Sequence, residues 1–154
     1  MAAYIMGLDL GQAATRSALC ILEQNDTTLA VAGAKPAKHY GCRGLKRWPL
    51  GTSYPAILAE IASWVAEPPL RDGILILGAT VAGRPVVELF VRAKPRLFIH
   101  SVVVTAGQGE GFAAGGYHVA KVNLISGVQV LLQQRRLRFA QSLAETPTLL
   151  KELQ

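Results

Sequence analysis

Two short apolar runs, Ile5–Leu8 and Ser17–Leu22, are separated by a glycine-containing turn near the start of the chain. The first run leads directly into an acid, Asp9, within the stretch GLDLGQAATRSAL (Gly7–Leu19). Apolar residues at successive positions are typical of strands in the middle of a sheet. A carboxylate at the end of such a strand is costly unless it is paired, hydrogen-bonded or bound to a cation. Asp9 is therefore expected to be either a functional group or a turn-forming residue that bonds nearby amides.

The segments after this stretch predict alternating strands and helices. A third strand is expected at Thr28–Ala34, in an antiparallel meander with the first two because the connections are short. A basic loop is expected at Gly41–Thr52, followed by a helix that Ser53 caps and that packs across the sheet over Tyr54–Val65. The next elements are expected to be a buried parallel strand at Ile74–Leu77, a helix from Pro85 to about Arg92 and a strand at Leu97–Val104. A glycine-rich segment at Ala106–Gly116 precedes a helix at Lys121–Gln134, whose apolar stripe is Leu124, Val128, Leu131 and Leu132. A short strand at Leu137–Ala140 and a helix at Pro147–Leu153 are expected last.

Length and composition place the chain among globular proteins. Its 154 residues are 51% hydrophobic, which is enough for one domain, expected over residues 1–154, with a packed core. No apolar run reaches the roughly 18 residues of a membrane span, and no basic region precedes the first apolar residues as in a signal peptide. A cytoplasmic protein without a membrane partner is expected. Cys20 and Cys42 are too few for a disulfide framework, and His39 with Cys42 lacks the second ligand pair of a zinc site.

The net charge of +6 arises from 16 basic and 10 acidic residues. Part of the positive charge is grouped in two stretches, one with Lys35, Lys38, Arg43, Lys46 and Arg47 and the other with Arg135, Arg136 and Arg138. Such grouping favours a polyanionic partner such as nucleic acid, while solvated faces and loops explain it equally well. Both interpretations stay open at the level of sequence.

The order of the expected elements, with an acid at the end of the first strand, is that of the ribonuclease H-like fold. Within that fold, the chain resembles the C-terminal nuclease domain of phage terminase large subunits, the DNA-packaging proteins of phages and prophages. The resemblance spans most of the chain and is carried by GLDLGQAATRSAL (Gly7–Leu19), LGTSYPAIL (Leu50–Leu58), GATVAGRPVVELF (Gly78–Phe90), VVVTAGQG (Val102–Gly109), VAKVNLI (Val119–Ile125), and LLQQRRLRFA followed by LLKEL. It implies an α/β fold with a mixed sheet, in which an antiparallel three-strand meander is followed by parallel strands and flanking helices.

Nucleases of this kind hold two divalent cations about 4 Å apart between converging carboxylates. The resemblance implies acids in the first strand, often in the turn that follows, at the end of the fourth strand and in a C-terminal helix. This chain keeps the first as Asp9, but it has Thr15 in the turn and Gly78 at the end of the fourth strand, and it reaches Gln154 before the last acid is expected. One carboxylate cannot hold two cations, so the resemblance implies the fold and argues against the activity.

Two other acids lie near these positions in the sequence. Glu88 falls about two turns into the second helix and Asp72 precedes the fourth strand, so neither replaces an acid at Gly78 geometrically. Asp9 is therefore interpreted as the remaining catalytic and metal-binding position of a lost acid cluster. No cofactor is expected to bind tightly, and Mg²⁺ or Mn²⁺ is expected at Asp9 only at low affinity.

Five basic residues are the expected nucleic-acid contacts. Arg43, Lys46 and Arg47 lie in the basic stretch, and Arg84 lies at the start of the second helix, where free amides and the helix dipole favour an anion. Lys121 matches a lysine of the terminase segment. Tyr54 and Trp64, in contrast, follow helical spacing and are expected to be core residues rather than base-stacking platforms.

These observations favour a degenerate, catalytically inactive terminase-nuclease-like domain of phage or prophage origin that retains nucleic-acid binding, with DNA as the partner. One alternative is a metal-dependent DNA nuclease completed by acids from another chain. Another is a non-enzymatic interaction module with a protein partner or a second copy of the chain. The opening stretch also looks like the first phosphate loop of actin-like ATPases, but those proteins are much longer, and no GxxxxGK[ST] sequence is present.

Overall fold

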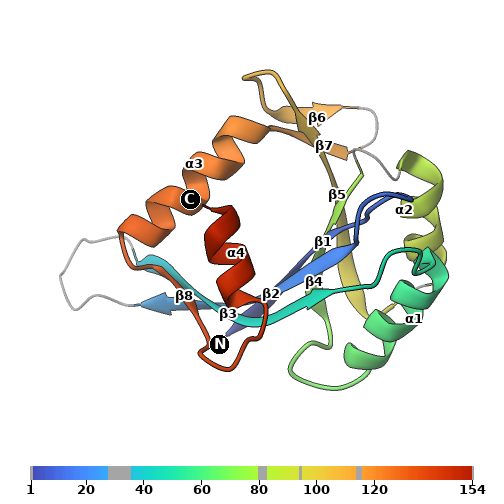
Figure 1. Cartoon of the computed structure of the whole chain (residues 1–154), viewed down its shortest axis with the longest axis horizontal. Coiled ribbons are helices and arrows are strands. Elements are labelled where there is room, and N and C mark those ends of the chain that lie inside the picture. Colours follow the sequence, from blue (N-terminus) through green and yellow to red (C-terminus); the bar gives the residue numbers. More distant parts are fainter. Residues whose placement is uncertain (1, 28–35, 80–82, 94, 114–115, 154) are drawn as a thin grey trace.

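The computed structural model describes residues 2–27, 36–79, 83–93, 95–113 and 116–153, and in this part of the chain the strands form one eight-stranded sheet (Figure 1). The strands are β1 (Ala3–Asp9), β2 (Ala18–Thr27), β3 (Ala37–Arg47), β4 (Gly73–Gly78), β5 (Leu97–Thr105), β6 (Gly111–Ala113), β7 (Gly116–Ala120) and β8 (Leu137–Phe139). The helices are α1 (Tyr54–Trp64), α2 (Gly83–Arg92), α3 (Lys121–Gln133) and α4 (Thr146–Glu152).

The strand order is β6-β7-β5-β4-β1-β2-β3-β8. Strand β2 is antiparallel to both β1 and β3, whereas β4, β5 and β7 continue the sheet in parallel on the other side of β1. This arrangement confirms the expected mixed sheet, with an antiparallel meander followed by parallel strands. It also confirms that Ile5–Leu8 lies in the middle of the sheet and that Ile74–Leu77 runs parallel to it.

The third strand differs from the one expected. Residues Thr28–Ala34 lie outside the described residues, and the strand that completes the meander is β3, which includes much of the expected basic loop Gly41–Thr52. The loop prediction is therefore wrong over Gly41–Arg47. Because this segment contains glycines and charged residues, it has no apolar pattern that predicts a strand. Its backbone is nevertheless paired with β2 from Ala37 to Arg47, with an irregularity next to Ile21.

One face of the sheet carries the hydrophobic core and is called the α1 face here, because α1 and α2 pack on it (Figure 1). Ser53 caps α1 by accepting a hydrogen bond from the Ala56 amide at 3.3 Å, and Pro55 lies in the first turn, as the sequence predicts. Three residues of α1 and one of α2 are buried against the sheet, namely Ile57, Leu58, Ile61 and Phe90. Met6, Leu8, Leu75 and Leu77 of the central strands complete this core.

The opposite face, called the α3 face here, carries α3 and α4 (Figure 1). These helices cover it less completely than α1 and α2 cover the α1 face. Neither helix has a fully buried residue, and Leu124 of the expected apolar stripe is 43% exposed. The stripe of α3 is therefore only partly covered. In the described part of the chain, these and the other helices are too short or too polar to span a membrane.

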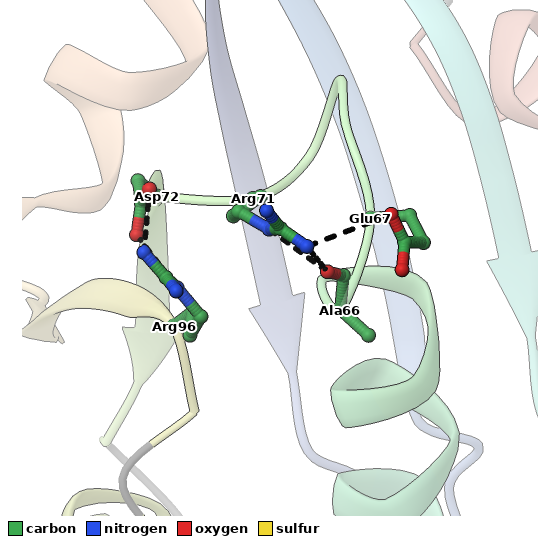
Figure 2. A network of polar contacts seen from close by, with 5 residues as sticks. All are labelled: Ala66, Glu67, Arg71, Asp72 and Arg96. Carbon is green, nitrogen blue, oxygen red and sulfur yellow. Dashed lines mark hydrogen bonds and ion pairs between the residues drawn. The ribbon is translucent and has the colours of Figure 1, made fainter.

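Polar contacts connect the end of α1 with the starts of β4 and β5 (Figure 2). The Arg71 Nε donates to the carbonyl of Ala66 at 2.9 Å, and the same guanidinium lies 3.5 Å from Glu67. Asp72, the next residue, forms an ion pair with Arg96 at 3.2 Å, and the Asp72 amide donates a hydrogen bond to the Arg96 carbonyl at 2.8 Å. The acid before the fourth strand therefore has a structural partner.

Candidate functional site

Asp9 lies at the carboxyl ends of the central parallel strands, in a row of five residues from five neighbouring strands. The pairing register places Arg47, Ala18, Asp9, Gly78 and Val102 side by side across β3, β2, β1, β4 and β5. A Cβ atom at position 78 would lie 3.3 Å from Asp9 Oδ1. The structure therefore brings together the two strand-end positions at which the resemblance implies acids, and position 78 holds glycine where a second carboxylate would lie beside Asp9.

The Asp9 carboxylate is exposed, and within the described residues it has no hydrogen bond or ion pair. The turn amides have other acceptors, because Gly11 N donates to Ser17 Oγ at 3.0 Å and Gln12 N donates to Thr15 Oγ1 at 2.9 Å. Asp9 is therefore not the residue that holds this turn. The cost of burying a carboxylate does not arise either, because its side of the sheet is open.

A cavity of about 590 Å³ lies between the α3 face of the sheet and helices α3 and α4, with Asp9 and Gly78 in its wall. Its lining is mostly apolar and includes Leu22, Leu45, Val128, Leu137, Phe139 and Leu149. The polar lining includes Asp9, Arg47 and two acids of the C-terminal segment, Glu145 and Glu152. No local pattern marks these two acids as site residues, because only the packing of α4 places them beside the cavity.

The carboxylates present do not fit a two-metal centre. Among the described residues, no three His, Cys, Asp or Glu side chains converge closely enough to hold a metal ion. Glu145 forms an ion pair with Arg47 at 3.3 Å, and Glu88 is held on α2 by Arg84 at 3.1 Å. Two close divalent cations need several shared carboxylates, and of the five described residues in the row at the strand ends, Asp9 is the one acid.

The five expected nucleic-acid contacts do not form one surface. Within the described residues, four of them have carboxylate partners: Arg43 with Glu23 at 2.6 Å, Lys46 with Glu60 at 3.1 Å, Arg47 with Glu145 at 3.3 Å, and Arg84 with Glu88 at 3.1 Å. Lys121 is exposed at the start of α3, and no ion pair of its ammonium group is found in this part of the chain. Because Lys46 and Arg47 are successive residues of a strand, they point to opposite faces of the sheet.

Glu60 connects α1 to the end of β3. Its carboxylate accepts a hydrogen bond from Trp48 Nε1 at 2.6 Å and pairs with Lys46. These contacts, the Trp48 bond first, hold the pKa of Glu60 below its ordinary value of 4.5. Trp48 also stacks on Trp64, with ring centroids 6.2 Å apart. The indoles are therefore part of the packing between β3 and α1, in agreement with the core role expected for Trp64.

The two cysteines lie close together on neighbouring strands. Their Sγ atoms are 3.7 Å apart, and Cys42 is buried. The hydrogen bond between the thiols lowers the pKa of Cys42 and raises that of Cys20. His39 lies three residues before Cys42 on β3 and so points to the opposite face of the sheet. The ligand-like spacing of His39 and Cys42 therefore does not bring the two side chains together.

No protein-family model and no curated protein matches the chain. Among solved structures, the chain is similar to the large terminase nuclease from thermophilic phage G20c, described in a crystal structure with bound zinc. The TM-score is 0.63 at 14% sequence identity, over 99% of this chain and 69% of the phage chain. The likeness confirms the ribonuclease H-like, terminase-nuclease-like fold that the sequence predicts.

Proposed function

We propose that this chain is a single ribonuclease H-like domain of phage or prophage origin that has lost nuclease activity and retains weak nucleic-acid binding. The observation that carries the proposal is the row at the strand ends, where Asp9 faces Gly78, and among the described residues no three His, Cys, Asp or Glu side chains converge to hold a metal ion. The fold supports descent from a terminase-type nuclease. Glycine in place of an acid at position 78 supports the loss of the nuclease reaction.

We expect the loss of nuclease activity on electrostatic grounds. Two divalent cations repel each other strongly at about 4 Å, and bridging carboxylates both neutralise that charge and set the separation. Water ligands do neither. A single Mg²⁺ or Mn²⁺ held weakly by Asp9 would keep most of its own waters and would have no second ion beside it to stabilise the leaving oxygen of a phosphodiester.

A plasmid-nicking assay with Mn²⁺ tests this part of the proposal. The wild-type chain and Asp9→Ala are both expected to leave supercoiled DNA intact. Gly78→Asp places a second carboxylate beside Asp9 and is expected to raise Mn²⁺ affinity, measured by calorimetry, with Asp9→Ala/Gly78→Asp as the matched control. Nicking by the wild type that disappears in Asp9→Ala would overturn the proposal and favour the alternative of a nuclease completed by acids from another chain.

Nucleic-acid binding is expected to be weak, independent of sequence and steeply dependent on salt, because the candidate contacts are cations directed at phosphates. Replacing Arg43, Lys46 and Arg47 together by Ala should weaken binding to a DNA duplex and flatten the slope of affinity against salt. Because all three side chains have carboxylate partners, we expect a smaller loss than three unpaired cations would produce. Absence of binding to duplex or single-stranded DNA at low salt would contradict this part of the proposal.

The apolar cavity beneath α3 and α4 supports a second candidate, a non-enzymatic interaction module. Its wall is mostly aliphatic, and α3 leaves Val122, Leu124, Ile125 and Val130 more than two-fifths exposed. Contiguous exposed apolar surface is typical of sites where proteins associate. Light scattering across a range of protein concentrations tests the case in which the partner is a second copy of the chain, which predicts a mass that rises with concentration.

A further inference from the structure

A second cavity, of about 570 Å³, lies on the outer part of the sheet, where β2, β3 and β8 are neighbours. Its polar lining comes from all three strands and the residue before β8, and includes Asn25, His39, Arg43, Arg136 and Arg138. The cavity is separate from the strand ends at Asp9. Gly41, in its lining, is six residues from Arg47 along β3, which corresponds to roughly 20 Å at the rise of a strand.

Gly41 forms the floor of this cavity. The register places Glu23, Gly41 and Arg138 side by side across β2, β3 and β8. Alternation along β2 puts Glu23 on the same side of the sheet as Ile21, which packs against the core, so this floor belongs to the α1 face. Because Gly41 has no side chain, the Arg43 guanidinium lies over it, and a Cβ at position 41 would be 3.3 Å from Arg43 Nε.

The charge of this cavity is positive and only partly balanced. Arg43 is paired with Glu23 at 2.6 Å. Arg136 is held by neutral acceptors, with its Nε donating to the Lys38 carbonyl at 2.8 Å and Nη1 donating to Gln134 Oε1 at 3.1 Å. These bonds orient the Arg136 guanidinium without neutralising it. The exposed Arg138 has no carboxylate partner in the described part of the chain. Three guanidinium groups thus share one carboxylate.

We propose that this cavity binds a phosphate group, through Arg138 and Arg43 with Arg136 and His39 at its edge. Guanidinium groups present paired donors that match the oxygens of a phosphate, and such charge-assisted bonds are stronger than neutral ones. The phosphate belongs either to a nucleic-acid backbone or to a small phosphorylated molecule, since both carry the same oxygens. The site therefore goes beyond the proposed nucleic-acid function and does not require it.

Two probes separate these sources. Fluorescence anisotropy with a labelled 20-nucleotide single strand reports on a polymer, and titration calorimetry with inorganic pyrophosphate reports on a small ligand, both at low salt with the full chain. Arg138→Ala is expected to weaken binding of at least one probe by about tenfold, because it removes a charged hydrogen-bonding partner. The matched control is Arg92→Ala, which removes the same charge from α2, where the side chain is 82% exposed; we expect a loss of less than about twofold.

Two further variants distinguish a built site from diffuse charge. Arg138→Lys keeps the charge but not the paired donors, and is expected to bind with intermediate affinity. Gly41→Leu keeps every charge but occupies the space over position 41 where the Arg43 guanidinium lies. It is therefore expected to displace Arg43 and to weaken binding as Arg138→Ala does. Circular dichroism and a thermal melt show whether each variant is folded.

If Arg138→Ala loses binding of the single strand alone, or of both probes, the result supports a phosphate site used by nucleic acid. If Arg138→Ala loses binding of pyrophosphate alone, the result supports a site for a small phosphorylated molecule, even if the wild type does not bind nucleic acid. The proposal is overturned if Arg138→Ala and Arg92→Ala have equal affinity for both probes, or if the wild type binds neither probe.

Discussion

The two faces of the central sheet differ in how completely helices cover them. On the α1 face, Ile57, Ile61 and Phe90 are fully buried. On the α3 face, neither α3 nor α4 has a fully buried residue, and a cavity of about 590 Å³ lies beneath them. The difference indicates that the α1 face supplies most of the hydrophobic stabilisation, while the α3 face leaves Asp9 accessible.

The cause of this difference is visible in the helices. Helix α1 begins at a Ser53 cap with proline in its first turn and directs one apolar stripe at the sheet. Helix α3 has no side-chain cap, and several of its apolar side chains point to solvent. A helix whose apolar residues are spread around its surface cannot bury all of them against one neighbour.

The largest expected effect on stability comes from replacing one leucine by alanine on each face of the sheet. Leu58→Ala on α1 removes a side chain that is 8% exposed and should lower the free energy of unfolding by about 2–4 kcal/mol through lost burial and a cavity. Leu124→Ala on α3 removes one that is 43% exposed and should cost less than about 1 kcal/mol. Urea denaturation measures both values. Equal losses would show that α3 is packed as tightly as α1 in solution.

A smaller effect is expected when a methyl group is added to each face. In Gly44→Ala, the new Cβ would lie 2.9 Å from Ile21 Cδ1 on the α1 face, so the Ile21 side chain must shift, at a cost of about 1–3 kcal/mol. In Gly7→Ala, the new Cβ meets no atom within 4 Å. We expect that variant to be unchanged or more stable by up to about 1 kcal/mol, because alanine restricts the unfolded chain. Destabilisation of Gly7→Ala in thermal melts would contradict an open α3 face.

The smallest expected effect concerns pH at the edge of the α1 face. The depressed pKa of Glu60 means that its ionised form stabilises the fold above its ordinary pKa of 4.5, and that this contribution is lost as the pH falls through the lower pKa of the folded state. Glu60→Gln should therefore be less stable than the wild type at pH 7, by less than about 1 kcal/mol for such a solvent-screened pair. The difference should shrink toward pH 3. A difference that stays constant between pH 7 and pH 3 would contradict this role.

Local patterns in the sequence predicted the elements that carry the core. The apolar runs Ile5–Leu8 and Ile74–Leu77 and the capped helix Tyr54–Val65 could be predicted because their periodicity and end signals are contained in a few adjacent residues. Their order also predicted the ribonuclease H-like fold. The pairing of Asp9 with Gly78 follows from that same order, because parallel neighbours end at the same edge of a sheet.

Contacts between distant segments settled what local patterns could not. Strand β3 is polar and contains two glycines, so only its pairing with β2 identifies it as a strand. The exposure of Asp9 depends on how loosely α3 and α4 cover the sheet. The presence of Arg43 and Arg138 in the lining of one cavity depends on β8 pairing with β3. These features arise from pairing and packing between residues far apart in the chain, and periodicity within one segment carries no information about them.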